Sequence, residues 1–103
     1  MHCGLTTEDL EVLNATFAKS EHVERVVLYG SRAKGNFKPF SDVDITLFGD
    51  AITYDDLVQL KMDIDDLLLP YQFDISLFKT LKNQDLIAHI ERVGIEIYNK
   101  NNL

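Results

Sequence analysis

The sequence predicts a small α/β domain, with a mixed sheet of about four strands and helices mainly on one face. Short apolar segments alternate along the chain with segments of helical periodicity. Two of the apolar segments, 44–48 and 74–78, repeat the same order of side-chain types. They lie about 30 residues apart with one expected helix between them, which is the size of a βαβ unit with parallel strands.

The composition limits the class of protein. The 103 residues are 46% hydrophobic and 26% charged, which suits a single domain spanning residues 1–103. No apolar run reaches the length of a membrane span, and the N-terminus lacks the basic and apolar regions of a secretion signal. The single cysteine, Cys3, is interpreted as a free surface thiol that suits a reducing cytoplasm. We therefore expect a cytoplasmic protein with no membrane partner.

The balance of charge disfavours one class of partner. With 17 acidic and 10 basic residues, the formal net charge is −7. Proteins that bind polynucleotides unaided usually present a basic surface, because neutralising phosphates supplies much of the affinity. We therefore expect no direct polynucleotide binding, whereas a single nucleotide can still bind through local groups and metal ions.

The first expected element is a helix near the N-terminus. Thr6 and Thr7 precede two acidic residues, which is typical of a helix start. Leu10, Leu13 and Phe17 would then share one face of this helix. That face is expected to contact the sheet.

A buried strand and a tight turn should follow. Residues 24–29 contain a continuous apolar run, which suits a strand buried on both faces. Gly30 and Ser31 interrupt this run. There is room for one helical turn before Gly35, and Pro39 closes the linker.

The second strand, residues 42–48, has two different faces because successive strand side chains point to opposite sides of a sheet. Since only a short turn separates it from the first strand, we expect these two strands to be antiparallel. One face carries Val43, Ile45 and Leu47, and the other carries Asp42, Asp44, Thr46 and Phe48.

Two further helices should flank the third strand. Thr53 is the expected N-cap of the first, which ends before Pro70, and Asn83 that of the second, which ends at Gly94. A short edge strand should follow at 95–98. The side chains expected on the apolar face of the first of these helices are Tyr54, Leu57, Val58, Ile64, Leu67 and Leu68.

The third strand, residues 73–78, supplies an isolated carboxylate. Its alternation points Ile75 and Leu77 to the core and Asp74 to the opposite face. If this strand and the second are parallel neighbours in register, Asp44 and Asp74 lie side by side, about one strand spacing apart.

The polar residues of these segments fit one kind of chemistry. The turn at Gly30 and Ser31 would present backbone N–H groups and a hydroxyl to an anion. Asp42, Asp44 and Asp74 on adjacent strands would hold one or two magnesium ions through their oxygens. Two such ions can clamp the attacking and leaving oxygens of a displacement at phosphorus, and Asp74 can help take the proton of the incoming hydroxyl.

Each of these signals alone has a simpler interpretation. A strand aspartate can be a solvated surface residue, and Arg32 and Lys34 beside the turn can bind phosphate or merely face solvent. The histidines His2, His22 and His89 have no partners nearby in the sequence, so we interpret them as structural or exposed. The combination of the turn with three carboxylates favours a metal site.

Two motifs stand out in this combination: Gly-Ser-Arg-Ala-Lys-Gly at 30–35 and Ser-Asp-Val-Asp at 41–44. Together with the isolated carboxylate they resemble the DNA polymerase beta-like nucleotidyltransferases, and within them the minimal nucleotidyltransferase (MNT) family. The resemblance covers almost the whole chain and implies the small two-layer polymerase beta-like nucleotidyltransferase fold. The resemblance implies that Gly30 and Ser31 bind the nucleotide and that Asp42, Asp44 and Asp74 serve catalysis and hold magnesium. Arg32, a basic residue beside the turn, is a further candidate for nucleotide binding.

The resemblance also implies a partner and a reaction. MNT proteins are commonly paired with helical HEPN toxins that cleave RNA, and some are understood to transfer AMP from ATP to a tyrosine hydroxyl of the toxin. The expected function is therefore Mg²⁺-dependent AMP transfer by an antitoxin, which would place the chain in a hetero-oligomer. Two alternatives stay open: a non-catalytic nucleotide-binding antitoxin that neutralises by complex formation, and the catalytic subunit of a small-molecule nucleotidyltransferase.

Overall fold

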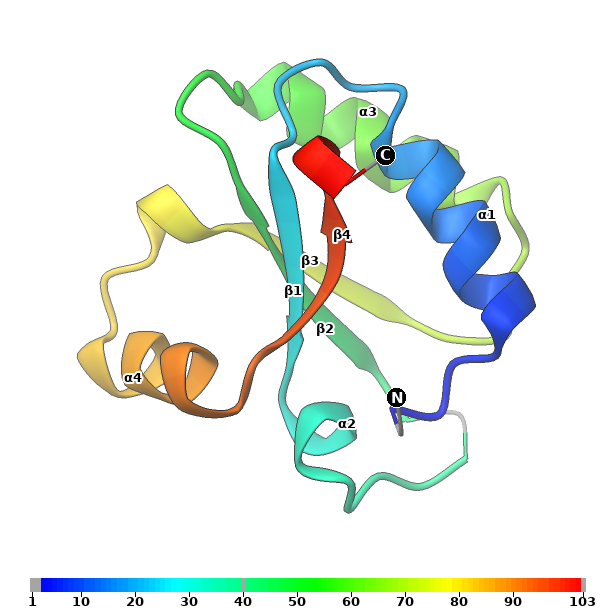
Figure 1. Cartoon of the computed structure of the whole chain (residues 1–103), viewed down its shortest axis with the longest axis vertical. Coiled ribbons are helices and arrows are strands. Elements are labelled where there is room, and N and C mark those ends of the chain that lie inside the picture. Colours follow the sequence, from blue (N-terminus) through cyan, green and yellow to red (C-terminus); the bar gives the residue numbers. More distant parts are fainter. Residues whose placement is uncertain (1–2, 40, 103) are drawn as a thin grey trace.

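The computed structural model describes residues 3–39 and 41–102, so His2 lies outside the described residues. Figure 1 shows how the elements are arranged around a central sheet. In chain order they are α1 (Thr7–Phe17), β1 (Arg25–Tyr29), α2 (Ser31–Lys34), β2 (Val43–Phe48), α3 (Tyr54–Asp65), β3 (Phe73–Leu77), the 3-10 turn η1 (Phe78–Thr80), α4 (Gln84–Val93), β4 (Ile95–Asn99) and the 3-10 turn η2 (Lys100–Asn102).

The sheet is mixed, and its four strands have the order β3-β2-β1-β4. β1 is antiparallel to both of its neighbours, β2 and β4, whereas β2 and β3 are parallel. The parallel pair arises because α3 returns the chain to the end of the sheet where β2 began. The predicted fold class, the antiparallel first pair, the parallel third strand and the edge position of the last strand are all confirmed.

α1 and α3 cover one face of the sheet and enclose the main core with it (Figure 1). The strand side chains on this face are those expected from the alternation, with Val43, Ile45 and Leu47 on β2 and Ile75 and Leu77 on β3, all of them buried. Because alternate side chains point the other way, the aspartates of β2 and β3 lie on the opposite face.

α3 buries a narrower face than we expected from the sequence. Leu57 and Ile64 are buried as predicted, but Tyr54, Val58 and Leu68 are 72%, 38% and 87% exposed. Tyr54 and Val58 are four residues apart and share the side of α3 that points away from the sheet. Leu68 lies beyond the end of the helix, where its backbone turns left-handed with φ 56°.

Both helices on this face begin with a capping box. The Thr6 hydroxyl accepts a hydrogen bond from the Asp9 N–H, and the Asp9 carboxylate accepts one from the Thr6 N–H, each at 3.0 Å. Thr53 and Asp56 repeat the arrangement at 3.1 and 2.9 Å. These contacts satisfy N–H groups that have no partner inside the helix, and they confirm the expected N-caps.

α4 covers part of the opposite face of the sheet, next to β1 (Figure 1). Ile90 packs with Val27 and Tyr29 in a second, smaller core. Gly94 ends α4 with φ −59°, so the glycine is not needed for a left-handed turn. A β-carbon there would instead collide with the Ile90 carbonyl oxygen and the Val27 side chain. The close approach of α4 to β1 therefore requires this glycine.

Candidate nucleotide and metal site

Three polar side chains form a row across the strands at one end of the sheet. Asp44 on β2 pairs with Tyr29 on β1 and with Asp74 on β3. Paired residues point to the same face, and the strands that carry them lie about 5 Å apart. Asp42 immediately precedes β2 and, two residues before Asp44, belongs to the same side of the chain. The predicted placement of Asp44 beside Asp74 is confirmed.

The like charges of this row act on Asp44. Its pKa is raised, first by burial and then by the carboxylates of Asp74 and Asp42. Asp42 and Asp74 are exposed, and Asp44 is half-buried. Within residues 3–39 and 41–102, no three acidic, histidine or cysteine side chains are gathered closely enough to hold a metal ion. The three carboxylates thus repel one another without converging on one point.

Hydroxyl groups lie beside the carboxylates on the same face. The Ser76 hydroxyl donates to the Thr46 hydroxyl at 3.0 Å, so these two residues fill the face with satisfied polar groups. Burial raises the pKa of Tyr29, and the charges of Asp74 and Asp44 raise it further against a lowering hydrogen bond with Ser76. The Tyr29 hydroxyl therefore stays protonated, and it is a neutral group beside two carboxylates.

Gly30 joins β1 to α2 and brings the turn against Asp44. Its backbone has φ 79° and ψ −154°, a conformation that glycine adopts far more readily than other residues. A β-carbon on Gly30 would also collide with a carboxylate oxygen of Asp44. Ser31 begins α2, so its N–H has no acceptor within the helix and can bind an anion. The structure thus places the predicted turn directly beside Asp44, one of the predicted carboxylates.

Arg32, the third predicted nucleotide contact, is buried, with only 1% of its surface exposed. Its Nη1 donates to the Cys3 carbonyl at 2.9 Å, and its Nε and Nη2 donate to the Ser41 carbonyl at 3.1 and 2.8 Å. The guanidinium also lies over the rings of Phe37 and Tyr71, at 5.0 and 4.9 Å from their centroids. Arg32 therefore ties the N-terminal segment to the loop that leads into β2.

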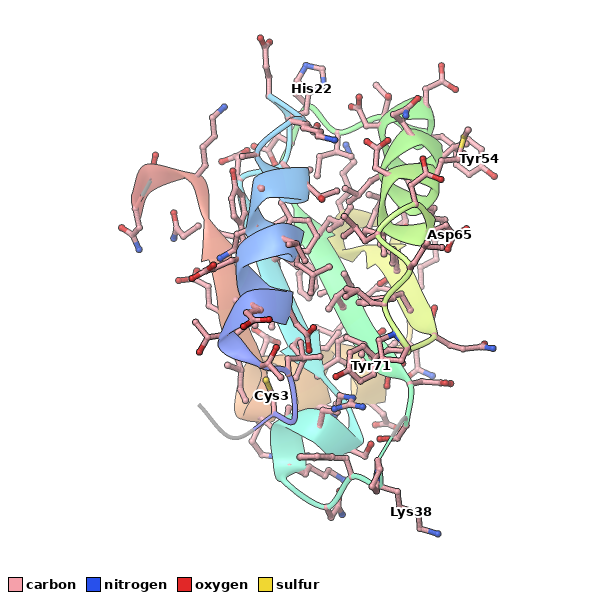
Figure 2. All side chains as sticks on the ribbon, turned by 90° about the vertical axis from the view of Figure 1, so that its right-hand side faces the viewer. Cys3, His22, Lys38, Tyr54, Asp65 and Tyr71 are labelled. Atoms are coloured by element: carbon pink, nitrogen blue, oxygen red, sulfur yellow. The ribbon has the colours of Figure 1, made fainter. Side chains whose placement is uncertain are left out.

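These contacts change how two residues are interpreted. A contact between Arg32 and a nucleotide stays a prediction, since the contacts described above are with the chain itself. Cys3 was expected to be a surface thiol, but it is fully buried at 0% exposure. Figure 2 shows Cys3 and Tyr71 near the same end of the domain, where the N-terminal segment packs onto it. The sequence carried no signal for this packing, because the acceptors of Arg32 are backbone carbonyls.

His89 on α4 is the candidate that sequence reasoning missed. Its Nε2 accepts a hydrogen bond from the Gly30 N–H at 3.1 Å. Its ring meets the Tyr29 ring edge-on, with 6.2 Å between centroids and 80° between planes. The available signal was helical spacing, which places position 89 on the same side of α4 as Leu86 and Ile90. That side faces the sheet.

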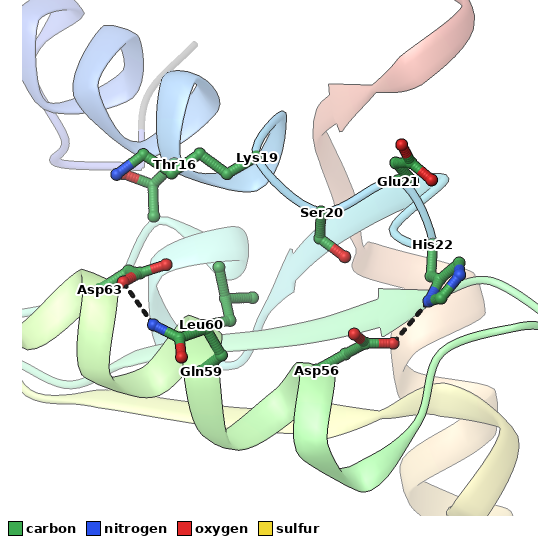
Figure 3. Close-up of a pocket in the computed structure, with 9 residues that line it drawn as sticks. All are labelled: Thr16, Lys19, Ser20, Glu21, His22, Asp56, Gln59, Leu60 and Asp63. Carbon is green, nitrogen blue, oxygen red and sulfur yellow. Dashed lines mark hydrogen bonds and ion pairs between the residues drawn. The ribbon is translucent and has the colours of Figure 1, made fainter.

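A pocket of about 280 Å³ lies away from this row, between the end of α1 and α3 (Figure 3). Within it, His22 Nδ1 and Asp56 Oδ2 are 2.7 Å apart, and Gln59 donates to Asp63 at 2.9 Å. The pKa of Asp56 is lowered, first by the Thr53 N–H and then by His22. None of the predicted site residues lines this pocket, and its His22–Asp56 pair lies at the capping box that begins α3.

The fold and the site together define a nucleotidyltransferase domain of the polymerase beta type, with a Gly-Ser turn after β1 and aspartates on the adjacent β2 and β3. The chain belongs to the family described as "Polymerase beta, Nucleotidyltransferase", whose sequence pattern matches residues 11–103. No curated protein matches the sequence. Among the helices of the described residues, none has the length and apolar character needed to span a bilayer.

Solved structures of toxin–antitoxin proteins share this fold. A toxin–antitoxin with AMP-PNP has a TM-score of 0.72 at 14% identity, covering 91% of this chain and 76% of that chain. A mutant of the toxin–antitoxin MntA–HpeT has a TM-score of 0.64 at 14% identity, covering 92% and 73%. A tri-AMPylated Shewanella oneidensis HEPN toxin in complex with MNT antitoxin gives 0.59 at 13% identity, covering 90% and 75%. At such low identities the similarity shows the fold alone.

Proposed function

We propose that this chain is the MNT antitoxin of a HEPN/MNT pair and that it transfers AMP from ATP to a tyrosine hydroxyl of its partner HEPN toxin. The observation that carries the proposal is the register of Asp44 with Asp74, directly beside the Gly30 turn. The structural neighbours add support, because one is a toxin–antitoxin with AMP-PNP and another is a tri-AMPylated HEPN toxin with its MNT antitoxin.

Asp42, Asp44 and Asp74 would hold magnesium, with two ions expected. The pKa of Asp44 is raised first by burial and then by repulsion from Asp74 and Asp42, and a cation among the carboxylates would relieve that repulsion. Asp42 and Asp74 are exposed, so their side chains can turn toward Asp44 at little cost. When bound, magnesium neutralises the charge of the phosphates and orients the reacting oxygens.

The chain's own residues would bind the nucleotide and take up a proton. The N–H and hydroxyl of Ser31 bind phosphate oxygens, and Gly30 allows their close approach because it has no side chain. The acceptor hydroxyl attacks the α-phosphorus of ATP, so a new O–P bond forms while the bond to pyrophosphate breaks. Asp74, which comes from the separate strand, takes the proton of that hydroxyl.

The acceptor would come from a second protein. In this proposal residues 1–103 form one domain that carries the nucleotide half of the site, and the HEPN partner presents the hydroxyl within a hetero-oligomer. The formal net charge of −7 supports association with a basic, RNA-binding protein and opposes direct polynucleotide binding. A cytoplasmic location is part of the same proposal, because ATP and magnesium are available there.

One observation favours a second candidate, a nucleotide-binding antitoxin that neutralises its partner by complex formation alone. Among the described residues, the three carboxylates do not converge closely enough to hold a metal ion. A chain in which they never converge could keep the phosphate-binding turn and still lack transfer. The two candidates differ in whether the partner gains mass.

Intact-mass spectrometry of both proteins after incubation with ATP and magnesium tests the proposal. We expect the partner to gain whole AMP units, and Asp42→Asn with Asp44→Asn to abolish the gain at unchanged thermal stability. Asp55→Asn with Asp65→Asn, the same charge change on exposed positions of α3, should leave the gain intact. A tight complex without any mass gain favours the second candidate, and modification at full rate by the Asp42/Asp44 variant contradicts the metal site.

A further inference from the structure

The Gly30–His89 hydrogen bond joins two segments that are far apart in the chain. The Gly30 N–H and the His89 Nε2 are separated by 59 residues and lie 3.1 Å apart in a partly buried position. A backbone N–H can only donate, so Nε2 must accept, and the ring proton must be on Nδ1. This bond therefore requires the neutral Nδ1–H tautomer of His89.

The imidazole is held in place by the packing of α4. Ile90, the next residue of α4, is 3% exposed and packs against Val27 and Tyr29. The Tyr29 ring meets the His89 ring edge-on, so the residue before Gly30 also contacts the imidazole. Because the packed helix and the Tyr29 ring already restrict the imidazole, it loses little conformational freedom when it accepts the hydrogen bond.

The position of Gly30 affects both halves of the candidate site. Its left-handed backbone starts α2 and so aims the N–H of Ser31, while its α-carbon lies against the Asp44 carboxylate. Since the Gly30 N–H is already bound to His89, it is not available to an anion, whereas Ser31 offers both its N–H and its hydroxyl at this turn. A shift of Gly30 would move these donors relative to Asp44.

We propose that His89 is a positioning residue for the nucleotide: by accepting the Gly30 N–H, it fixes the turn so that Ser31 meets the phosphates at the correct distance from Asp44. The inference rests on the proposed function only in that Ser31, next to Gly30, binds phosphate. It gives α4 a positioning role, although the sequence motifs of the turn and the carboxylates do not include this helix.

Substitutions of His89 separate this role from simple packing. His89→Ala should weaken the binding of ATP in the presence of magnesium by about tenfold, which corresponds to the loss of one hydrogen bond. His89→Gln should retain most of the affinity, because its amide oxygen reaches the place of Nε2. His89→Asn, with a shorter side chain, should behave like the alanine variant. The affinities would be measured by isothermal titration calorimetry.

Leu86→Ala is the matched control for packing. Leu86 is a partly buried residue of the same helix and packs in the same small core, but the hydrogen bond does not involve it. The Leu86→Ala variant should have a lower thermal stability but an ATP affinity within about twofold of the wild type. An equal loss of affinity in Leu86→Ala, full affinity in His89→Ala, or no recovery in His89→Gln would overturn the proposal.

Amide hydrogen exchange at Gly30 gives a readout that needs no activity. Exchange should be slow in the wild type and in His89→Gln, and fast in His89→Ala. Equal exchange in the wild type and His89→Ala would contradict the hydrogen bond itself. Because affinity and exchange are measured without a partner, a failure of AMP transfer to the toxin would leave this result unaffected and would count only against the proposed function.

Discussion

Asp44 and Asp74 occupy equivalent positions on two adjacent parallel strands, and two residues further along the Thr46 and Ser76 hydroxyls are hydrogen-bonded at 3.0 Å. The sequence match between 44–48 and 74–78 therefore reflects two neighbouring strands that share one environment. This register has an electrostatic cost, because the pairing that aligns the Thr46 and Ser76 hydroxyls also places the Asp44 carboxylate beside that of Asp74.

Asp74→Asn should lower the pKa of Asp44, because Asp74 raises it more than Asp42 does. The folded pKa of Asp44 is above its ordinary value of 3.8, so stability falls as pH rises from about 3.8 to the folded pKa. In the Asp74→Asn variant the pH range between 3.8 and the folded pKa of Asp44 should be narrower, so stability should fall less across it. Carbon-13 NMR titration of the carboxyl groups measures the shift. Asp50→Asn, beyond the other end of β2, should leave it unchanged.

Arg32→Lys should destabilise the fold by about 1–3 kcal/mol, because an ammonium cannot reach the Cys3 and Ser41 carbonyls together and lacks the planar guanidinium that lies over the Phe37 and Tyr71 rings. Urea denaturation measures the loss. Lys34→Ala, an exposed change in the same helical turn, should stay within about 0.5 kcal/mol. If Arg32→Lys kept full stability and still lost ATP affinity, the direct nucleotide contact predicted from the sequence would gain support.

Leu68→Gly should stabilise the protein by about 0.5–1 kcal/mol, because a left-handed backbone is costly for leucine and not for glycine. Leu68 has φ 56° and is 87% exposed, so little packing is lost with its side chain. Thermal and urea unfolding would measure the gain. Lys61→Gly, at an exposed position inside α3, should instead cost about 1 kcal/mol. If Leu68→Gly were instead less stable than the wild type, the leucine side chain would make a contact that stabilises the fold by more than its left-handed backbone costs.

Asp56→Ala should lower the melting temperature most strongly near neutral pH. The folded pKa of Asp56 is lowered, so its contribution to stability is present above its ordinary value of 3.8 and is lost as pH falls through the folded pKa. The difference between variant and wild type should therefore shrink in acid. Asp55→Ala removes a neighbouring acid outside the capping box and is the control. A difference that did not depend on pH would argue against the charged cap.

Much of the fold was predictable because its signals are local. The alternation of apolar and polar residues along β2 and β3 predicted which side chains enter the core and which carboxylates face away from it. Threonine or asparagine before an acidic or apolar run predicted where each helix begins. The face of α3 was predicted less well. Tyr54 and Val58 are apolar enough to suggest a core position, but the angle at which α3 packs on the sheet turns their side of the helix outward.

The sequence by itself determined that Asp44 and Asp74 lie side by side. A strand–helix–strand unit of this length forms a parallel pair, and side-chain alternation then places both aspartates on the same face of the sheet. It also determined the Gly-Ser turn, since few residues other than glycine tolerate that backbone. Only the tertiary structure decided which side chains hold the turn and the loop before β2. Arg32 and His89 bind backbone carbonyls and a backbone N–H, groups that nearly every residue carries, so only the packing of the N-terminal segment and of α4 selects the partner.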